Sequence, residues 1–281
     1  MVDEQEIVSL MNQRIKSLLQ IGNIIAVILT IIINGLAVIL PLNNKTTQEL
    51  SDAIPNLFVP AGITFSIWTI IYILLICFAL YQARDLGKKE KQDMPFLHQI
   101  HGFFILASIG NILWIVLWHY EQVIFSLAAM FLLLVSLLRI YQRVHIGATK
   151  VSRTEKLCVH TPMSVYLGWI TVATIANVTA VLVTVGWDGF GISEMLWTIL
   201  VIIVAVLITI LMLFKRNDIA YSLVVIWALL GIALKRFSDD PIYGVQPEIA
   251  YTAVGAILVL GLMILILAIR TSMKKIQSQT D

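Results

Sequence analysis

Charged side chains are scarce in this chain of 281 residues, since only 13% of its residues are Asp, Glu, Lys or Arg. Soluble domains carry about 25% charged residues. Hydrophobic residues make up 59% of the chain, and the mean hydropathy is +0.91. An apolar excess of this size cannot be hidden in the core of a water-soluble domain. The composition therefore predicts an all-α integral membrane protein with the lipid bilayer as its partner.

Several chemical signatures are missing as well. The two cysteines stand apart, Cys77 in an apolar run and Cys158 in a basic loop, without metal-ligand spacing, so we expect neither a disulfide nor a metal site. The net charge is only +2 and the basic residues are scattered, which argues against nucleic-acid binding. P-loop, HExxH and GxSxG patterns are absent, and this disfavours familiar enzyme chemistry without excluding catalysis.

Apolar runs long enough for a membrane helix, which needs about 17–25 residues, occur eight times. They cover approximately residues 21–40, 62–82, 101–118, 123–141, 163–185, 195–214, 219–234 and 249–269. Residues 1–20 mix charged and apolar residues and are expected to form an N-terminal interfacial segment, and residues 270–281 a tail. The run at 219–234 is the shortest of the eight, and we expect Lys235 and Arg236 to snorkel from its end.

Basic residues are unevenly distributed between the two predicted faces of the membrane. Of the 19 lysines and arginines, only Lys45, Lys235 and Arg236 fall in the segments of one face, and the others lie in the loops of the opposite face or at adjoining span ends. Cytoplasmic loops carry an excess of Lys and Arg. We therefore expect a bacterial-type plasma (inner) membrane protein with both termini in the cytoplasm.

No lysine, arginine, aspartate or glutamate lies in the middle third of any predicted span. This excludes a retinal-type pigment and disfavours ion-coupled transport, because both need charges at that depth. The polar residues that do lie inside the spans are uncharged and accompanied by aromatic residues. The candidate site residues lie on spans two, three and five, at spacings of three or four that share a helix face, and they are Trp68, Tyr72, Asn111, Trp114, Trp169, Ala173 and Asn177.

Two interpretations of these polar and aromatic faces remain open. In the first, amide and hydroxyl groups join helices by hydrogen bonds and tryptophans anchor the helices at the membrane surface. In the second, the faces converge on an aromatic-lined cavity for a lipophilic ligand. The loop at 43–61 is either a plain connector or a lid over such a cavity, because Pro55 and Pro60 stiffen a tip that contains Phe58.

Three motifs resemble the TspO/MBR family, that of the translocator protein and the tryptophan-rich sensory protein. Residues 55–72 resemble its loop-to-second-helix signature at Pro55, Pro60, Trp68, Thr69 and Tyr72. Residues 111–118 resemble its third-helix pattern at Asn111 and Trp114. Residues 166–177 resemble its fifth-helix pattern at Tyr166, Trp169, Ala173 and Asn177. Together the motifs cover approximately residues 20–186.

The resemblance implies a TspO-like five-helix bundle at 21–186, followed by three additional transmembrane helices at 195–269, eight in total. It also implies a cavity for a porphyrin or haem-like ligand without an obligatory cofactor, and a homodimer. The chain departs from the family pattern at Gly62, where the family commonly has a tryptophan, and this puts light-dependent porphyrin breakdown in doubt.

Three functions are compatible with these observations. The resemblance favours a membrane-embedded binding or sensory protein for a lipophilic ligand such as a tetrapyrrole. The alternatives are a permease for a small apolar solute and a membrane scaffold subunit. His101 and His119 lie at opposite ends of the third span, so we expect no specific iron ligation by them.

Overall fold

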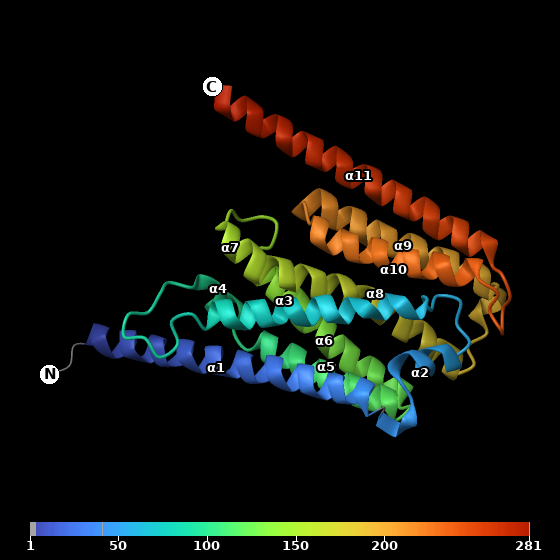
Figure 1. Ribbon diagram of the computed structural model, residues 1–281, viewed down its shortest axis with the longest axis horizontal. Coiled ribbons are helices and arrows are strands. Elements are labelled where there is room, and N and C mark those ends of the chain that lie inside the picture. Colours follow the sequence, from blue (N-terminus) through green and yellow to red (C-terminus); the bar gives the residue numbers. More distant parts are fainter. Residues whose placement is uncertain (1–3, 41, 281) are drawn as a thin grey trace. The chain divides into compact units, whose positions relative to one another are not determined.

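The computed structural model describes residues 4–40 and 42–280, and this part of the chain contains helices and no strands. Its long apolar helices are α1 (Glu4–Ile39), α3 (Ile67–Gln82), α5 (Phe103–His119), α6 (Val123–Arg143), α8 (Thr161–Thr184), α9 (Glu194–Arg216), α10 (Ile219–Phe237) and α11 (Pro247–Thr280) (Figure 1). The short elements are η1 (Leu42–Asn44), α2 (Thr47–Ala53), η2 (Gly62–Ser66), α4 (Pro95–Ile100), α7 (Arg153–Glu155), η3 (Lys156–His160) and η4 (Gly189–Gly191).

Each of the eight predicted runs falls on one of the long helices. Seven of these stretches are long and apolar enough to cross a membrane, and α5 is a shorter apolar helix of 17 residues. The left-handed backbone of His101 (φ 50°) and of Glu121 (φ 57°) lies just outside the two ends of α5 and limits its length. The shortest predicted run is a full helix, α10, because the Asp218 side chain caps its first turn and the helix continues to Phe237.

The first helix differs from the expected short interfacial segment followed by a separate span. α1 is continuous from Glu4 to Ile39, and Lys16 and Gln20 on it are buried. Residues 1–3 of the predicted N-terminal segment lie outside the described residues. At the other end of the chain, the predicted tail continues the helix α11 as far as Thr280.

The chain divides into two compact units. Unit 1 comprises the residues up to Leu50 together with Trp68–Leu167, and unit 2 comprises Ser51–Ile67 and the residues from Gly168 onward. The predicted division at residue 186, between a five-helix bundle and three further helices, stays a prediction.

Close helix packing holds unit 1 together. α5 packs along α6 and also along α1. At Gly110 on α5 the two backbones approach so closely that a Cβ atom would lie 2.8 Å from the Leu133 nitrogen and 3.1 Å from the Ala129 carbonyl oxygen. Small residues allow such contacts between membrane helices. The α5–α6 contact therefore depends on the missing side chain at position 110.

A loop segment is part of the core of unit 2. α9, α10 and α11 pack against one another, and η2 lies on α10. The Ala61 N–H donates a 2.9 Å hydrogen bond to the Gly231 carbonyl, and the Trp227 indole N–H donates a 3.0 Å bond to the Thr64 carbonyl. A Cβ atom on Gly231 would overlap the Thr64 hydroxyl. The segment 51–67 is thus fixed to α10 by complementary shape and by hydrogen bonds.

Candidate functional site

Stacked aromatic rings form a cluster in unit 1, here called the unit 1 aromatic cluster. Its members are Trp68 and Tyr72 on α3, Trp114 and Trp118 on α5, and Tyr166 on α8. The Trp68 ring lies 5.7 Å from Tyr72 and 6.2 Å from Trp114, with planes inclined by 24° and 26°. It meets Tyr166 edge-on at 6.1 Å. Three predicted site residues, Trp68, Tyr72 and Trp114, therefore lie together.

Asn111 lies one helical turn from Trp114 and is fully buried. Its side-chain oxygen accepts a 2.6 Å hydrogen bond from the Asn34 amide of α1. Its amide nitrogen lies near the Tyr166 hydroxyl, yet neither atom makes a hydrogen bond of good geometry. Buried polar groups without a partner are uncommon, and each calls for water, a ligand or a functional reason. A donor and a hydroxyl thus remain available beside the stacked rings.

The other predicted site residues belong to unit 2. Trp169, Ala173 and Asn177 follow one another along α8, with Trp169 and Asn177 buried and Ala173 half-buried. The Trp169 ring meets Phe65 edge-on, with centroids 6.1 Å apart and planes at 78°. That all seven residues line one cavity stays a prediction, because they divide between the two units.

The predicted lid is a built-in part of unit 2. Phe58 and Pro60 are buried, and Pro55 is exposed. Asn56 fixes the loop, because its amide donates a 2.6 Å bond to the Thr179 hydroxyl and its side-chain oxygen accepts from the Phe58 N–H at 2.9 Å. The apolar tip therefore packs into protein.

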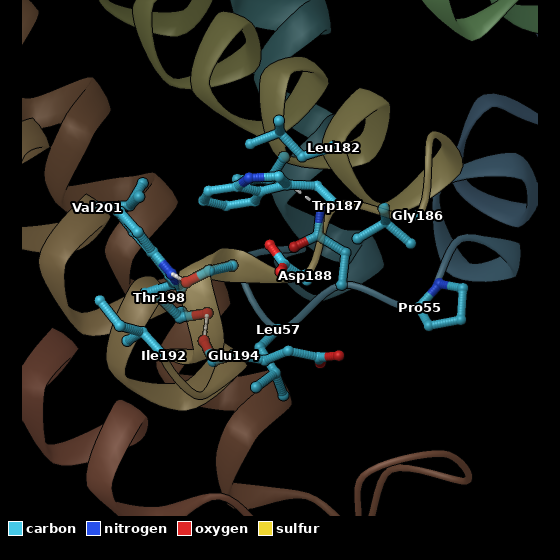
Figure 2. Close-up of a pocket in the computed structure, with 15 residues that line it drawn as sticks. Pro55, Leu57, Leu182, Gly186, Trp187, Asp188, Ile192, Glu194, Thr198 and Val201 are labelled. Carbon is cyan, nitrogen blue, oxygen red and sulfur yellow. Dashed lines mark hydrogen bonds between the residues drawn. The ribbon is translucent and has the colours of Figure 1, made fainter.

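A cavity of about 440 Å³ opens in unit 2 where α8 ends and α9 begins (Figure 2). Pro55 and Leu57 of the loop, Trp187 and Trp197, and the carboxylates of Asp188 and Glu194 contribute to its lining. Binding pockets for small molecules have volumes of about 300–1,000 Å³. Of the residues predicted as a lid, Pro55 does line a cavity, but this cavity differs from the expected one in its other members.

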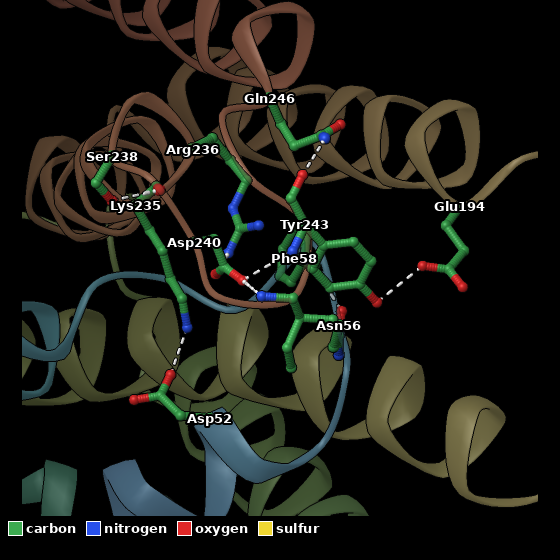
Figure 3. Close-up of polar contacts among 11 residues, drawn as sticks. Asp52, Asn56, Phe58, Glu194, Lys235, Arg236, Ser238, Asp240, Tyr243 and Gln246 are labelled. Atoms are coloured by element: carbon green, nitrogen blue, oxygen red, sulfur yellow. Dashed lines mark hydrogen bonds and ion pairs between the residues drawn. The ribbon is translucent and has the colours of Figure 1, made fainter.

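A second cavity of about 310 Å³, lined by Asp52, Asn56, Lys235 and Tyr243 among others, lies beside a group of ion pairs in unit 2 (Figure 3). Lys235 pairs with Asp52, and buried Arg236 pairs with Asp240 at 3.1 Å. Both basic residues at the end of α10 thus have acidic partners in unit 2, and the expected snorkelling stays a prediction.

Burial, hydrogen bonds and nearby charges determine the protonation states of Asp240 and Tyr243. Burial raises the pKa of Asp240, but backbone N–H groups of Ile242 and Tyr243 and the charge of Arg236 lower it more, so the net pKa lies below its ordinary value. Burial, together with a 2.9 Å hydrogen bond to Glu194, raises the pKa of Tyr243 above its ordinary value. Asp240 is therefore ionised and Tyr243 neutral at physiological pH.

α1 also carries a buried polar face. This face was not predicted from the sequence, because the predicted polar residues lie on spans two, three and five. It consists of Lys16, Gln20, Asn23, Thr30 and Asn34, spaced by three, four or seven residues. Lys16 forms an ion pair with Asp85, and Gln20 donates to the Asp85 carboxylate at 2.7 Å. The helical spacing of these polar residues inside and just before the first apolar run was the signal that could have revealed this face.

Within residues 4–40 and 42–280 no three His, Cys, Asp or Glu side chains gather as a group that could hold a metal ion. His119 is buried and occupied on both sides, with its Nδ1 2.8 Å from the Ile115 carbonyl oxygen and its Nε2 3.5 Å from the Thr47 hydroxyl.

The helices and their composition define a multi-pass, all-helical membrane protein. A family model described as TSPO-like protein matches residues 20–266, which is most of the chain. The protein therefore belongs to the TSPO-like family, and the match includes α9, α10 and most of α11. No curated protein and no solved structure gives a match.

Proposed function

We propose that this TSPO-like membrane protein binds a planar lipophilic ligand of the tetrapyrrole class at the unit 1 aromatic cluster, and that it acts as a sensory or binding protein. Trp68 and Tyr72 are half-buried, so part of their ring surface remains open to a ligand. Offset stacking on aromatic rings adds about 0.5–1.5 kcal/mol to the burial of apolar area. A tetrapyrrole offers the large π face that such stacking requires.

The observation that supports this proposal best is the pair of unpaired polar groups beside the rings. The Asn111 amide nitrogen and the Tyr166 hydroxyl are buried near each other, and neither makes a hydrogen bond of good geometry. Leaving such groups unsatisfied costs about 1–3 kcal/mol each. A ligand with nitrogen or oxygen atoms at its edge would pair with both while its ring lies against Trp68.

Location and assembly are part of the same proposal. The uneven distribution of basic residues supports insertion in a plasma membrane with both termini in the cytoplasm. The family resemblance supports a homodimer.

The test is a titration of the purified protein with protoporphyrin in neutral-lipid nanodiscs, followed by tryptophan quenching and by the shift of the porphyrin absorbance band. We expect saturable binding that Trp68→Leu and Asn111→Leu each weaken by about tenfold, equivalent to about 1.4 kcal/mol. Phe125→Leu is the matched control, because Phe125 is an exposed aromatic residue of unit 1 on α6.

Two results would overturn the proposal. One is a lack of saturable binding by the folded protein. The other is an affinity that Trp68→Leu and Asn111→Leu leave at the wild-type value. Trp169→Phe in the same titration shows whether the site extends to the predicted residues of unit 2.

A further inference from the structure

The cavity between the ends of α8 and α9 has a chemical character different from that of the unit 1 aromatic cluster. It lies at the edge of the membrane-spanning segments, which end at Thr184 and resume at Glu194. Figure 2 shows the carboxylates of Asp188 and Glu194, the Trp187 indole and the apolar side chains Leu182 and Val201 around one space. The cavity thus combines negative charge, aromatic surface and an apolar wall.

The charge of this cavity is uncompensated. Its lining residues include two carboxylates and no Lys, Arg or His. The two basic side chains of α10 are already paired, Lys235 with Asp52 and Arg236 with Asp240. One oxygen of Asp188 accepts the Phe190 N–H at 3.0 Å, and one oxygen of Glu194 accepts the Tyr243 hydroxyl at 2.9 Å. In each carboxylate the second oxygen has no hydrogen-bond partner among the described residues.

The aromatic part of the lining is held in a fixed orientation. Trp187 and Trp197 lie 5.1 Å apart with planes at 54°, and Phe190 packs edge-on against Trp187. The Trp197 indole N–H donates a 2.8 Å hydrogen bond to the Gly189 carbonyl, which fixes that ring relative to the loop. Tryptophan faces attract cations through their negative quadrupole, and choline-type ammonium ions are recognised in this way.

We propose that this cavity binds a lipophilic organic monocation of the ammonium type. The charged group would lie between the Asp188 and Glu194 carboxylates and the two indoles, at the membrane surface. The apolar body would extend along Leu182, Val183 and Val201 toward the membrane interior. A ligand with carboxylate groups, such as a tetrapyrrole, is excluded from this cavity by repulsion, so the site is independent of the one proposed above.

The test compares two ions of the same shape and opposite charge, tetraphenylphosphonium and tetraphenylborate, by isothermal titration calorimetry on the full-length protein in neutral-lipid nanodiscs. After the heat of each ion with protein-free nanodiscs is subtracted, we expect saturable binding of tetraphenylphosphonium to the protein and none of tetraphenylborate. Glu194→Gln should weaken phosphonium binding by about tenfold, because the amide keeps the hydrogen bond to Tyr243 and loses only the charge. Trp187→Leu should weaken it as well, through loss of the aromatic face.

Asp239→Asn is the matched control, because Asp239 is an exposed acidic residue of unit 2 that does not line the cavity. This variant should bind tetraphenylphosphonium with the affinity of the wild type. Equal binding of the two ions, or a phosphonium affinity unchanged in Glu194→Gln and in Asp188→Asn, would overturn the proposal. Protoporphyrin titrated into the same wild-type preparation reports on the other site, so the failure of one proposal is distinguished from the failure of the other.

Discussion

The side-chain amide of Asn34 donates a hydrogen bond to the side-chain oxygen of Asn111, and this 2.6 Å contact joins α1 to α5 inside the membrane span. Asn34 also donates to the Thr30 carbonyl of its own helix at 2.8 Å. The bond therefore orients Asn111, whose amide nitrogen points toward Tyr166.

A double-mutant cycle with Asn34→Ala and Asn111→Ala should reveal this contact as a coupling energy. Hydrogen bonds between membrane helices are worth about 0.6 kcal/mol on average and about 1.7 kcal/mol at most. We expect a coupling within this range, measured as the free energy of unfolding in mixed micelles. Strict additivity of the two single variants would show that the two amides do not interact.

The ion pair between Lys16 and Asp85 should be essential for the stability of unit 1. Both side chains are buried, at 8% and 0% exposure, and Lys16 also donates to the Gln92 carbonyl at 2.5 Å. Removing one member of a buried pair costs about 3–5 kcal/mol, because the other charge stays buried without compensation. Asp85→Asn should lower the midpoint of thermal unfolding far more than Lys45→Gln, which removes an exposed pair with Glu121 worth about 0–1 kcal/mol.

The pH dependence of this pair follows from the Asp85 carboxyl. Burial raises its pKa, but hydrogen bonds from Lys16, Gln20 and the Gln92 N–H outweigh burial and lower the pKa to about 2, from 3.8. Because the folded-state pKa is depressed, the stabilisation is complete above about pH 4 and is lost as the pH falls toward 2. The difference in stability between wild type and Asp85→Asn should shrink across that window, and a difference independent of pH there would contradict this assignment.

Much of the helical architecture could be predicted from composition and run length, because each membrane helix must satisfy its own backbone hydrogen bonds with apolar side chains outside. The step of four between Trp68 and Tyr72 also predicted a shared face, and their rings stack. Trp114, which stacks on Trp68, was identified as a site residue from its motif. The contact between the two rings could not be predicted, because it depends on how the side chains of α3 and α5 pack.

Other features could not be predicted in this way. The burial of Pro60 and Thr64 depends on the absence of a side chain at Gly231, which is 171 positions beyond Pro60 in the sequence, and no local pattern shows that pairing. The cavity beside Trp187 and Glu194 likewise depends on how a loop folds between two helices. The polar face of α1 could have been predicted from its helical spacing. Its partner Asp85 could not, because Asp85 lies in a loop, where no periodic pattern indicates which residue it contacts.

Orientation in the membrane can be tested by cysteine labelling. In a background without Cys77 and Cys158, Lys89→Cys and Asp239→Cys place single thiols at exposed positions in loops predicted to lie on opposite faces. An impermeant maleimide applied to intact cells should label Asp239→Cys alone, and both variants after permeabilisation. Labelling of Lys89→Cys in intact cells would reverse the proposed topology.

Gly231 should be the position at which the smallest possible substitution disturbs unit 2 most. An added Cβ atom would overlap the Thr64 hydroxyl and lie 3.0 Å from the Pro60 Cβ, so the segment 51–67 would have to move away from α10. That movement weakens the 2.9 Å bond from Ala61 to the Gly231 carbonyl and the 3.0 Å bond from Trp227 to Thr64. Overpacking of this kind costs about 1–3 kcal/mol, so Gly231→Ala should lower the thermal midpoint and increase proteolysis near residues 51–60.

Gly255→Ala is the matched control for this substitution, because Gly255 is an exposed helical glycine of α11 with nothing within 4 Å of its added Cβ atom. Alanine is favoured over glycine inside a helix by about 0.5–1 kcal/mol, so this variant should be as stable as the wild type or more stable. The two substitutions are chemically identical and should shift stability in opposite directions. Equal shifts in both variants would mean that helix propensity, and not the fit of the loop against α10, determines the response at position 231.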